Sequence, residues 1–357
     1  MSRIISFTEA IRESTEQIMK KYDNTIVMGL GVSYKNGADG TMGNLKEVYP
    51  NRILDTPVSE FCLTGAGVGS AITGLRPIIH HSRVEFALFA IDQIITQAAK
   101  WNYMFGGGNP VPIVFRLAVG RQWGNGPQHT QALYSLFGNV PGLKVVIPST
   151  PKMAKGLLNA AVKDNNPVIY LEPRWLYGLK GDVEEEYYEC DLSKSRYVRR
   201  GNDITIVTYG DGIVDSIKAL NILKDYDISA DLIDLVSINP IDYDLIFESL
   251  SKTGTLLCID TTNSAFSVGS EIISKVSLNA FDLLKRNPFA LSAPDTPCPT
   301  STSLTEDFYP TKVSIVNKVL SIFNKGEYVE EMTFEELHLS PKVIVEDEEK
   351  YEIEYEE

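Results

Sequence analysis

One acidic side chain, Glu60, lies among residues that could shield a carboxyl group from water. Val58, Phe61, Cys62 and Leu63 surround it in the sequence, and a glycine-rich segment occupies positions 65 to 74. The glycine spacing fits neither a dinucleotide fingerprint nor a phosphate-binding P-loop. Desolvation raises the pKa of a carboxyl group and keeps its proton available, so Glu60 is a candidate for proton transfer.

A second candidate for proton transfer is His129. It lies in a stretch of glycine, proline and glutamine that ends at Gln131, and such a composition predicts a loop. Because a histidine changes its charge near neutral pH, a loop position at the mouth of a channel suits a proton carrier. The structural alternative is a histidine that only binds a loop carbonyl.

Composition excludes several classes of function. The 357 residues carry 47 acidic and 33 basic side chains, a net charge of −14, which argues against binding a nucleic-acid backbone. Four widely spaced cysteines, without a CxxC pair, predict reduced thiols and a cytoplasmic protein. No apolar run reaches the roughly 18–20 residues that span a bilayer, so we expect neither a membrane protein nor an exported one.

The first half of the chain alternates helix and strand patterns. A helix is expected to begin near residues 6–10, with Thr8 as its cap, and to end at Lys21, before a strand at 25–29. Short apolar runs without alternation indicate buried parallel strands covered by helices. Further strands are predicted at 76–80, 111–118, 143–147 and 167–171, and helices at 84–100 and 151–164.

A charged stretch then interrupts the pattern, and the alternation starts again. We predict domains at 1–182 and 201–328, joined by a linker at 183–200, and an acidic tail at 329–357 that is either a solvated appendage or a partner-binding arm. In the second domain, strands are predicted at 204–210, 230–236 and 254–260, and helices at 213–224, 243–252, 269–277 and 312–324. The expected fold class is α/β, with two three-layer domains and mostly parallel sheets.

Many short motifs occur in one order that resembles the β subunit of thiamine-diphosphate-dependent 2-oxo acid dehydrogenases, with the pyruvate dehydrogenase type most similar. They lie at residues 53–60, 65–69, 74–78, 90–93, 110–116, 128–131, 141–146, 163–168, 238–242 and 268–272. The resemblance covers about residues 5–325 and implies a pyrimidine-binding domain followed by a transketolase C-terminal-like domain.

The resemblance assigns roles to residues of the first domain. Glu60 matches the glutamate that protonates the aminopyrimidine ring of thiamine diphosphate, and Val58 lies beside it in the cofactor-binding motif. Phe86 occupies the position of the aromatic ring that stacks on the aminopyrimidine, although Phe86 taken alone would be a core residue. His129 matches the histidine that assists proton transfer and acyl transfer to a lipoyl group.

The resemblance also implies partners and ions. Thiamine diphosphate and Mg²⁺ would be shared with an α subunit in a two-α, two-β assembly, and a lipoyl acyltransferase is a further candidate partner. Gly210-Asp211-Gly212 with Asn239 imitates the magnesium motif of this fold, but it lies in the second domain, so we do not interpret it as a magnesium site. A structural potassium site would use the backbone carbonyls of Ile113, Ala161, Val162, Asp164 and Asn166.

The chain departs from the family near these residues. Where the family has an acidic residue and an aromatic-rich run, this chain has His80, His81 and Arg83, and Arg121-Gln122-Trp123 stands where small residues are usual. The two histidines and Arg83 either bind an anionic or polyhydroxylated substrate group or pair with carboxylates of the α subunit.

Three functions follow from this reading. The first is oxidative decarboxylation of a 2-oxo acid with acyl transfer to a lipoyl group. The second is a split transketolase-like, acyloin-forming or carboligase enzyme with the same cofactor. The third is a non-catalytic paralogue that acts as a scaffold or regulator, although Glu60, Phe86 and His129 argue against it.

Overall fold

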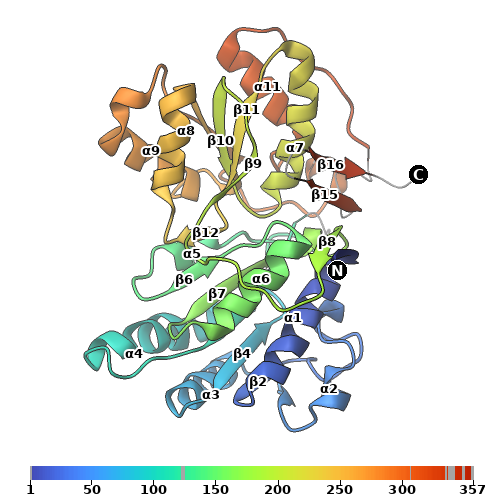
Figure 1. Cartoon of the computed structure of the whole chain (residues 1–357), viewed down its shortest axis with the longest axis vertical. Helices are drawn as coiled ribbons and strands as arrows, with labels where there is room; N and C mark the ends of the chain where they lie inside the picture. Colours follow the sequence, from blue (N-terminus) through green and yellow to red (C-terminus); the bar gives the residue numbers. More distant parts are fainter. Residues whose placement is uncertain are drawn as a thin grey trace.

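The computed structural model describes residues 2–121, 125–305, 307–333, 336, 342–347 and 350–354. Within this part of the chain two α/β domains lie one above the other, and the first strand and the last two strands lie at their junction (Figure 1). The positions of Gln122, Trp123 and Gly124, which precede His129, are outside the described residues.

Seven strands form the sheet of the first domain, in the order β12-β6-β7-β5-β4-β2-β3, with only the β12 and β6 pair antiparallel. The strands are β2 (Thr25–Gly29), β3 (Ile53–Asp55), β4 (Arg76–His81), β5 (Val114–Val119), β6 (Lys144–Val146), β7 (Val168–Pro173) and β12 (Ser237–Asn239). The helices are α1 (Phe7–Lys21), α2 (Leu45–Val48), α3 (Glu60–Ile72), α4 (Ala99–Met104), α5 (Tyr134–Gly138) and α6 (Pro151–Lys163), with 3₁₀ turns η1 (Ala38–Gly40) and η4 (Arg174–Leu176).

Both faces of this sheet are covered by helices. Ile78 of β4 packs in one hydrophobic cluster with α1 and α6, while the next residue, Ile79, packs in another with α3. Because successive side chains of a strand point to opposite faces, each strand must be apolar on both sides. The predicted parallel sheet between helix layers is therefore present.

The second domain repeats this arrangement with five strands in the order β14-β13-β10-β11-β9, all parallel except β9. The strands are β9 (Arg196–Arg199), β10 (Ile204–Thr208), β11 (Ala230–Asp234), β13 (Leu256–Asn263) and β14 (Phe289–Ala293). The helices are α7 (Gly212–Leu223), α8 (Tyr243–Thr253), α9 (Val268–Asn279), α10 (Thr302–Thr305) and α11 (Lys312–Phe323), with 3₁₀ turns η5 (Lys224–Tyr226) and η6 (Phe281–Leu283).

Two local predictions are corrected. The cap of α1 is Ser6, whose hydroxyl oxygen accepts from the Glu9 backbone N–H while Glu9 accepts from the Ser6 backbone N–H; Thr8 donates to the Tyr177 carbonyl instead. The helix predicted at 84–100 is a 3₁₀ turn η2 (Phe86–Ala90) followed by a π-helix η3 (Asp92–Ala98) and α4. Wide π turns are rare and concentrate at functional sites.

The predicted linker and tail are partly built into sheets. Residues 196–199 of the linker form β9, and β8 (Lys180–Glu184) crosses its predicted start. β1 (Ser2–Ser6) pairs with one side of β8, and β15 (Val343–Asp347) pairs with the other and with β16 (Lys350–Glu354). Within the described part of the tail, residues 343–347 and 350–354 are therefore held in a sheet by backbone hydrogen bonds, whereas Val329 is 83% exposed.

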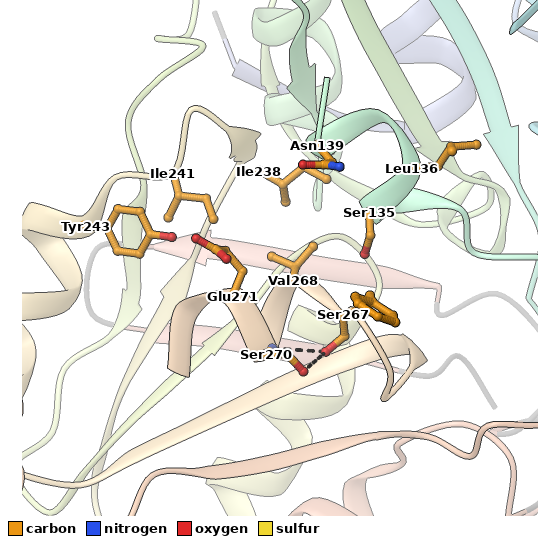
Figure 2. A pocket seen from close by; sticks show the side chains of 12 residues that line it. Ser135, Leu136, Asn139, Ile238, Ile241, Tyr243, Ser267, Val268, Ser270 and Glu271 are labelled. Atoms are coloured by element: carbon orange, nitrogen blue, oxygen red, sulfur yellow. Dashed lines mark hydrogen bonds between the residues drawn. The ribbon is translucent and has the colours of Figure 1, made fainter. Parts of the chain in front are cut away.

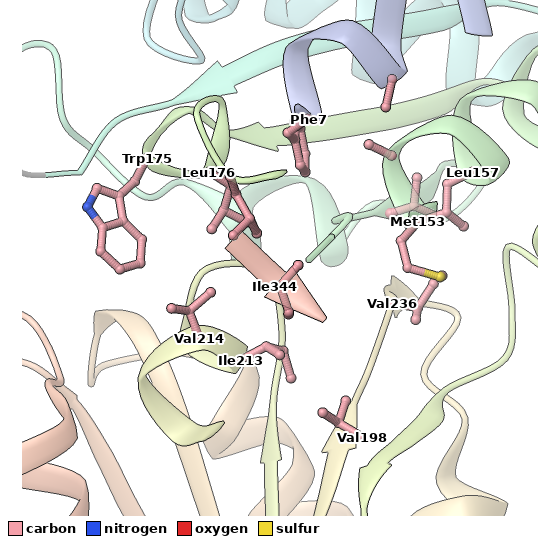
Figure 3. Packing of buried hydrophobic residues seen from close by; sticks show 14 of the residues in the cluster. Phe7, Met153, Leu157, Trp175, Leu176, Val198, Ile213, Val214, Val236 and Ile344 are labelled. Carbon is pink, nitrogen blue, oxygen red and sulfur yellow. The ribbon is translucent and has the colours of Figure 1, made fainter. Parts of the chain in front are cut away.

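Ile344 of β15 packs between the two domains. Its side chain is fully buried beside Leu176 and Phe7 of the first domain and Ile213 and Val214 of the second (Figure 3). Burial of the Ile344 side chain against both domains therefore holds strand β15 of the tail at the junction between them.

We expect Ile344→Ala to destabilise the protein by about 2–4 kcal/mol, because it removes buried methyl groups and leaves a cavity. Val329→Ala, at a position that is 83% exposed, is the matched control and should change stability by less than about 0.5 kcal/mol. Thermal unfolding of the full chain measures both. Equal midpoints for the two variants would mean that the tail does not support the domain junction.

Candidate functional site

The three residues to which the sequence assigns the chemistry follow neighbouring parts of the first sheet. Glu60 begins α3 just after β3, Phe86 begins η2 just after β4, and His129 lies between β5 and α5. The carboxyl ends of parallel strands lie at one edge of a sheet, which is where α/β proteins bind ligands. Parallel topology therefore explains how residues up to 69 positions apart come together.

Glu60 and Phe86 line one narrow recess of about 10 Å³. Other residues of its wall are Leu30, Pro57, Ser59, Leu63, His80, His81 and Ser82. A carboxylate and an aromatic ring on one recess fit an aminopyrimidine, which needs a partner for its ring nitrogen and a surface for stacking.

The apolar surroundings expected around Glu60 are not found within this chain. Val58 is 72% exposed and Phe61 is 54% exposed, Cys62 is also exposed, and only Leu63 is buried. Exposed apolar side chains beside a candidate site mark an interaction surface. A second chain would have to cover them before they could desolvate the carboxyl group.

His80 and His81 are the last two residues of β4. They form part of the recess wall and are only 1% and 3% exposed. Burial, together with the charge of Arg116, holds the pKa of His80 well below its ordinary value, and burial lowers the pKa of His81 to about 4. Nε2 of His81 lies 3.1 Å from the Thr64 hydroxyl oxygen. Both imidazoles are therefore neutral at neutral pH and can exchange hydrogen bonds, but they bring no positive charge to a substrate.

Arg116 acts on His80 because of the sheet register. The two residues are direct partners across β4 and β5, which places their side chains on the same face. Arg116 is fully buried and forms a two-point ion pair with Glu172, with Nε to Oε1 at 2.6 Å and Nη2 to Oε2 at 3.0 Å. A fixed guanidinium beside an imidazole disfavours the protonated ring.

Phe86 and His129 are in contact. Their ring centroids are 5.6 Å apart at 79°, an edge-to-face arrangement. Nη1 of Arg83 donates to the carbonyl oxygen of His129 at 3.1 Å, so Arg83 does not line the recess but holds the histidine loop. Of His80, His81 and Arg83, only the two histidines line the recess with Glu60.

The unusual Arg121 joins the two domains. Its Nη1 donates to Oδ2 of Asp211 at 3.0 Å and its Nη2 to Oδ2 of Asp215 at 2.7 Å. The guanidinium also lies 4.1 Å from the ring of Trp175 and is 3% exposed. The two carboxylates raise the pKa of Arg121 and keep it charged, while burial raises the pKa of Asp211.

This ion pair accounts for the motif that imitates a magnesium site. Asp211 accepts from Arg121, and the amide of Asn239 donates to the carbonyl oxygens of Gly138 and Val140 at 3.2 and 3.4 Å. Both residues are therefore engaged in contacts within this chain. Within the described residues no group of three or more metal-ligating side chains is found.

The carbonyl set proposed for potassium is largely engaged by other groups. Nη1 of Arg76 donates to the carbonyls of Val162 and Asp164 at 2.7 and 3.0 Å, and the Ile113 carbonyl accepts from the Val168 N–H at 2.9 Å. Arg76 thus brings positive charge to the end of α6, as helix carboxyl ends favour. Ala161 and Asn166 complete the predicted set, but this geometry gives potassium no support.

A larger cavity in the described part of the chain lies elsewhere. It has a volume of about 720 Å³ and opens between α5, the segment around Ile241 and α9, where Tyr243 and Glu271 point toward one another (Figure 2). None of Glu60, Phe86 or His129 lines it. Cavity size alone would therefore point away from these three candidate residues.

Two domains of this topology, with ligand residues at the carboxyl edge of the first sheet, define a transketolase-like architecture. Residues 3–180 match the transketolase pyrimidine-binding domain and residues 193–315 match the transketolase C-terminal domain. The chain also superposes on a split-gene transketolase in an inactive β4 tetramer, with a TM-score of 0.73 over 90% of this chain and 99% of that one, at 19% identity.

The chain belongs to the family of β subunits of thiamine-diphosphate-dependent 2-oxo acid dehydrogenases. It is 38% identical to the acetoin:2,6-dichlorophenolindophenol oxidoreductase β subunit of Bacillus subtilis over 91% of this chain and 99% of that protein. It is 39% identical to the pyruvate dehydrogenase E1 β subunit of Rhizobium meliloti over 89% of this chain and 69% of that protein, and 37% identical to the mitochondrial one of Saccharomyces cerevisiae over 90% of each. The resemblance inferred from the motifs is confirmed.

Proposed function

We propose that this chain is the β subunit of an enzyme that decarboxylates a 2-oxo acid with thiamine diphosphate and transfers the acyl group to a lipoyl group. The observation that carries the proposal is that Glu60 and Phe86 line one recess at the carboxyl edge of the first sheet, with the ring of His129 against Phe86. Family membership supports the cofactor, and in this proposal these three residues act on it and on its substrate.

Bound thiamine diphosphate supplies the carbon that attacks the substrate carbonyl and stores the electrons released when the carbon–carbon bond breaks. In this proposal the Glu60 carboxyl holds a proton at the aminopyrimidine nitrogen. The ring of Phe86 holds the pyrimidine face, Val58 adds an apolar contact to the cofactor, and His129 moves a proton near the substrate.

His80 and His81 select the substrate in this proposal. They line the recess together with Glu60 and Phe86, which supports the first of the two roles considered for them. Because they are neutral, they suit a hydroxyl or carbonyl group better than a second carboxylate. Arg83 instead supports the loop of His129.

The proposal requires an α subunit that contributes the diphosphate and Mg²⁺ sites and covers Val58 and Phe61. A two-α, two-β assembly and a lipoyl acyltransferase partner complete it. We place the complex in the cytoplasm, which fractionation of the source cells would test. No helix among the described residues has the length and apolarity to span a bilayer.

A second candidate substrate is acetoin. Two relatives are acetoin:2,6-dichlorophenolindophenol oxidoreductase β subunits, from Bacillus subtilis and Cupriavidus necator, at 38% and 37% identity. A hydroxyketone carries no carboxylate, so the neutral His80 and His81 would suit it. The cofactor and the roles of Glu60, Phe86 and His129 stay the same.

The deciding experiment uses the chain co-purified with its α subunit. Substrate consumption is measured with 2-oxo acids and with acetoin, first with 2,6-dichlorophenolindophenol as the electron acceptor and then with a lipoyl domain. We expect His129→Asn to retain dye reduction within about tenfold and to lower transfer to the lipoyl domain by about 10²-fold or more, since the dye takes its protons from water and needs no positioned proton donor. No turnover of any 2-oxo acid or acetoin by the unmodified complex would overturn the proposal.

A further inference from the structure

The turn that carries Phe86 also holds the loop that carries His129. Arg83 donates to the His129 carbonyl at 3.1 Å, and Phe86 contacts the imidazole ring. Between them, Oε1 of Glu85 accepts from the backbone N–H of Gln131 at 2.6 Å. Residues 83–86 therefore contact both His129 and Gln131 of the histidine loop.

Glu85 has a free acceptor at this place. Its side chain is buried, with 6% of the residue exposed. Among the described residues, neither Oε2 of Glu85 nor Nδ1 of His129 has a hydrogen-bond partner, although both atoms are buried. A buried carboxylate oxygen without a partner is costly, and it is retained mainly where its charge or acceptor capacity is used.

The electrostatic surroundings connect the two groups. Burial raises the pKa of Glu85, while the Gln131 N–H and the positive charges of Arg83 and His129 oppose that shift. The charges of Asp39 and Arg174 also act on Arg83. The positive charge of His129 therefore acts on the Glu85 carboxylate, next to the hydrogen bond that joins Glu85 to the histidine loop.

We propose that Glu85 is the positioning residue of His129: it holds the histidine loop through the Gln131 backbone and supplies the negative charge that supports the protonated imidazole. This inference rests on the role proposed for His129 in catalysis. It adds a residue that the sequence motifs did not single out. The signal was a lone acidic side chain between Val84 and Phe86, immediately before the stacking ring.

The test compares Glu85→Gln, which keeps the acceptor oxygen but removes the charge, with Glu85→Asp, which keeps the charge but shortens the side chain. Asp39→Asn is the matched control, since Asp39 acts on Arg83 but is not among the charges that act on Glu85. The first readout needs no activity: the full chain reacts with diethyl pyrocarbonate at several pH values, and peptide mass spectrometry quantifies modification of His129.

Neutral imidazole is the reactive form, so loss of the Glu85 charge should speed modification at mildly acidic pH. We expect Glu85→Gln to react about threefold faster or more near pH 6, and Glu85→Asp and Asp39→Asn to react within about twofold of the unmodified chain. In the assembled enzyme, Glu85→Gln should move the acidic limb of the kcat profile, with KM changed by less than about threefold.

Unchanged His129 modification in Glu85→Gln, in a chain that melts within a few degrees of the unmodified protein, would overturn the inference. If Glu85→Gln is too unstable for this comparison, Glu85→Asp decides: faster modification in a variant that retains the charge would also overturn it. The modification rate and the melting temperature are measured on the isolated chain and do not depend on turnover. An inactive complex would therefore contradict the proposed function but would not decide this inference.

Discussion

Glu60→Gln should lower turnover of the assembled enzyme by about 10²–10⁴-fold while the protein stays folded. The amide occupies the same volume at the start of α3 and still exchanges hydrogen bonds, but it cannot deliver a proton to the aminopyrimidine ring. The effect should fall on kcat, because the interaction lost is one made during proton transfer. Steady-state rates with 2,6-dichlorophenolindophenol measure it, and calorimetric titration measures the remaining affinity for thiamine diphosphate.

Glu47→Gln is the control for this variant. Glu47 is an exposed glutamate in the first turn of α2, in the same domain, and should leave the rate within about twofold. Loss of the cofactor from Glu60→Gln at saturating concentration would mean that the residue binds rather than activates. An unchanged rate would remove Glu60 from the proposed mechanism.

Arg121→Met should destabilise the protein by about 3–5 kcal/mol, because it leaves Asp211 and Asp215 buried without their cation. The melting temperature should then fall by about 10 °C. The triple variant with Asp211→Asn and Asp215→Asn should recover at least half of the loss, since it removes the unpaired charges as well. Because Arg121 begins the segment that leads to His129, the single variant should also lose activity.

Arg200→Met provides the matched comparison. Arg200 pairs with Glu248 at 3.5 Å, but the two side chains are 61% and 62% exposed, so this change should cost less than about 1 kcal/mol. Thermal unfolding of all three variants, followed by circular dichroism, makes the comparison. Equal melting temperatures for Arg121→Met and Arg200→Met would mean that the ion pair of Arg121 with Asp211 and Asp215 does not stabilise the contact between the domains.

The local fold was largely predictable from patterns in the chain. Short apolar runs such as residues 167–171 predicted β7, and the periodicity of residues 151–164 predicted α6, because burial on both faces or on one stripe leaves a direct signal in the sequence. The π-helix η3 was not predictable, since its residues have ordinary helical periodicity. The cap of α1 was misplaced by two residues because both Ser6 and Thr8 are suitable caps.

The sequence by itself determined the family, and it predicted the roles of Glu60, Phe86 and His129, since these residues stand in ordered motifs whose residue types the chemistry demands. Only the tertiary structure decided how the departures from the family are used. Arg121 meets Asp211 and Asp215 some 90 residues later, Arg83 holds a carbonyl 46 residues away, and Glu85 holds the N–H of Gln131. Such pairings depend on which strand ends lie side by side, and sheet order is a property of packing that no local pattern in the chain records.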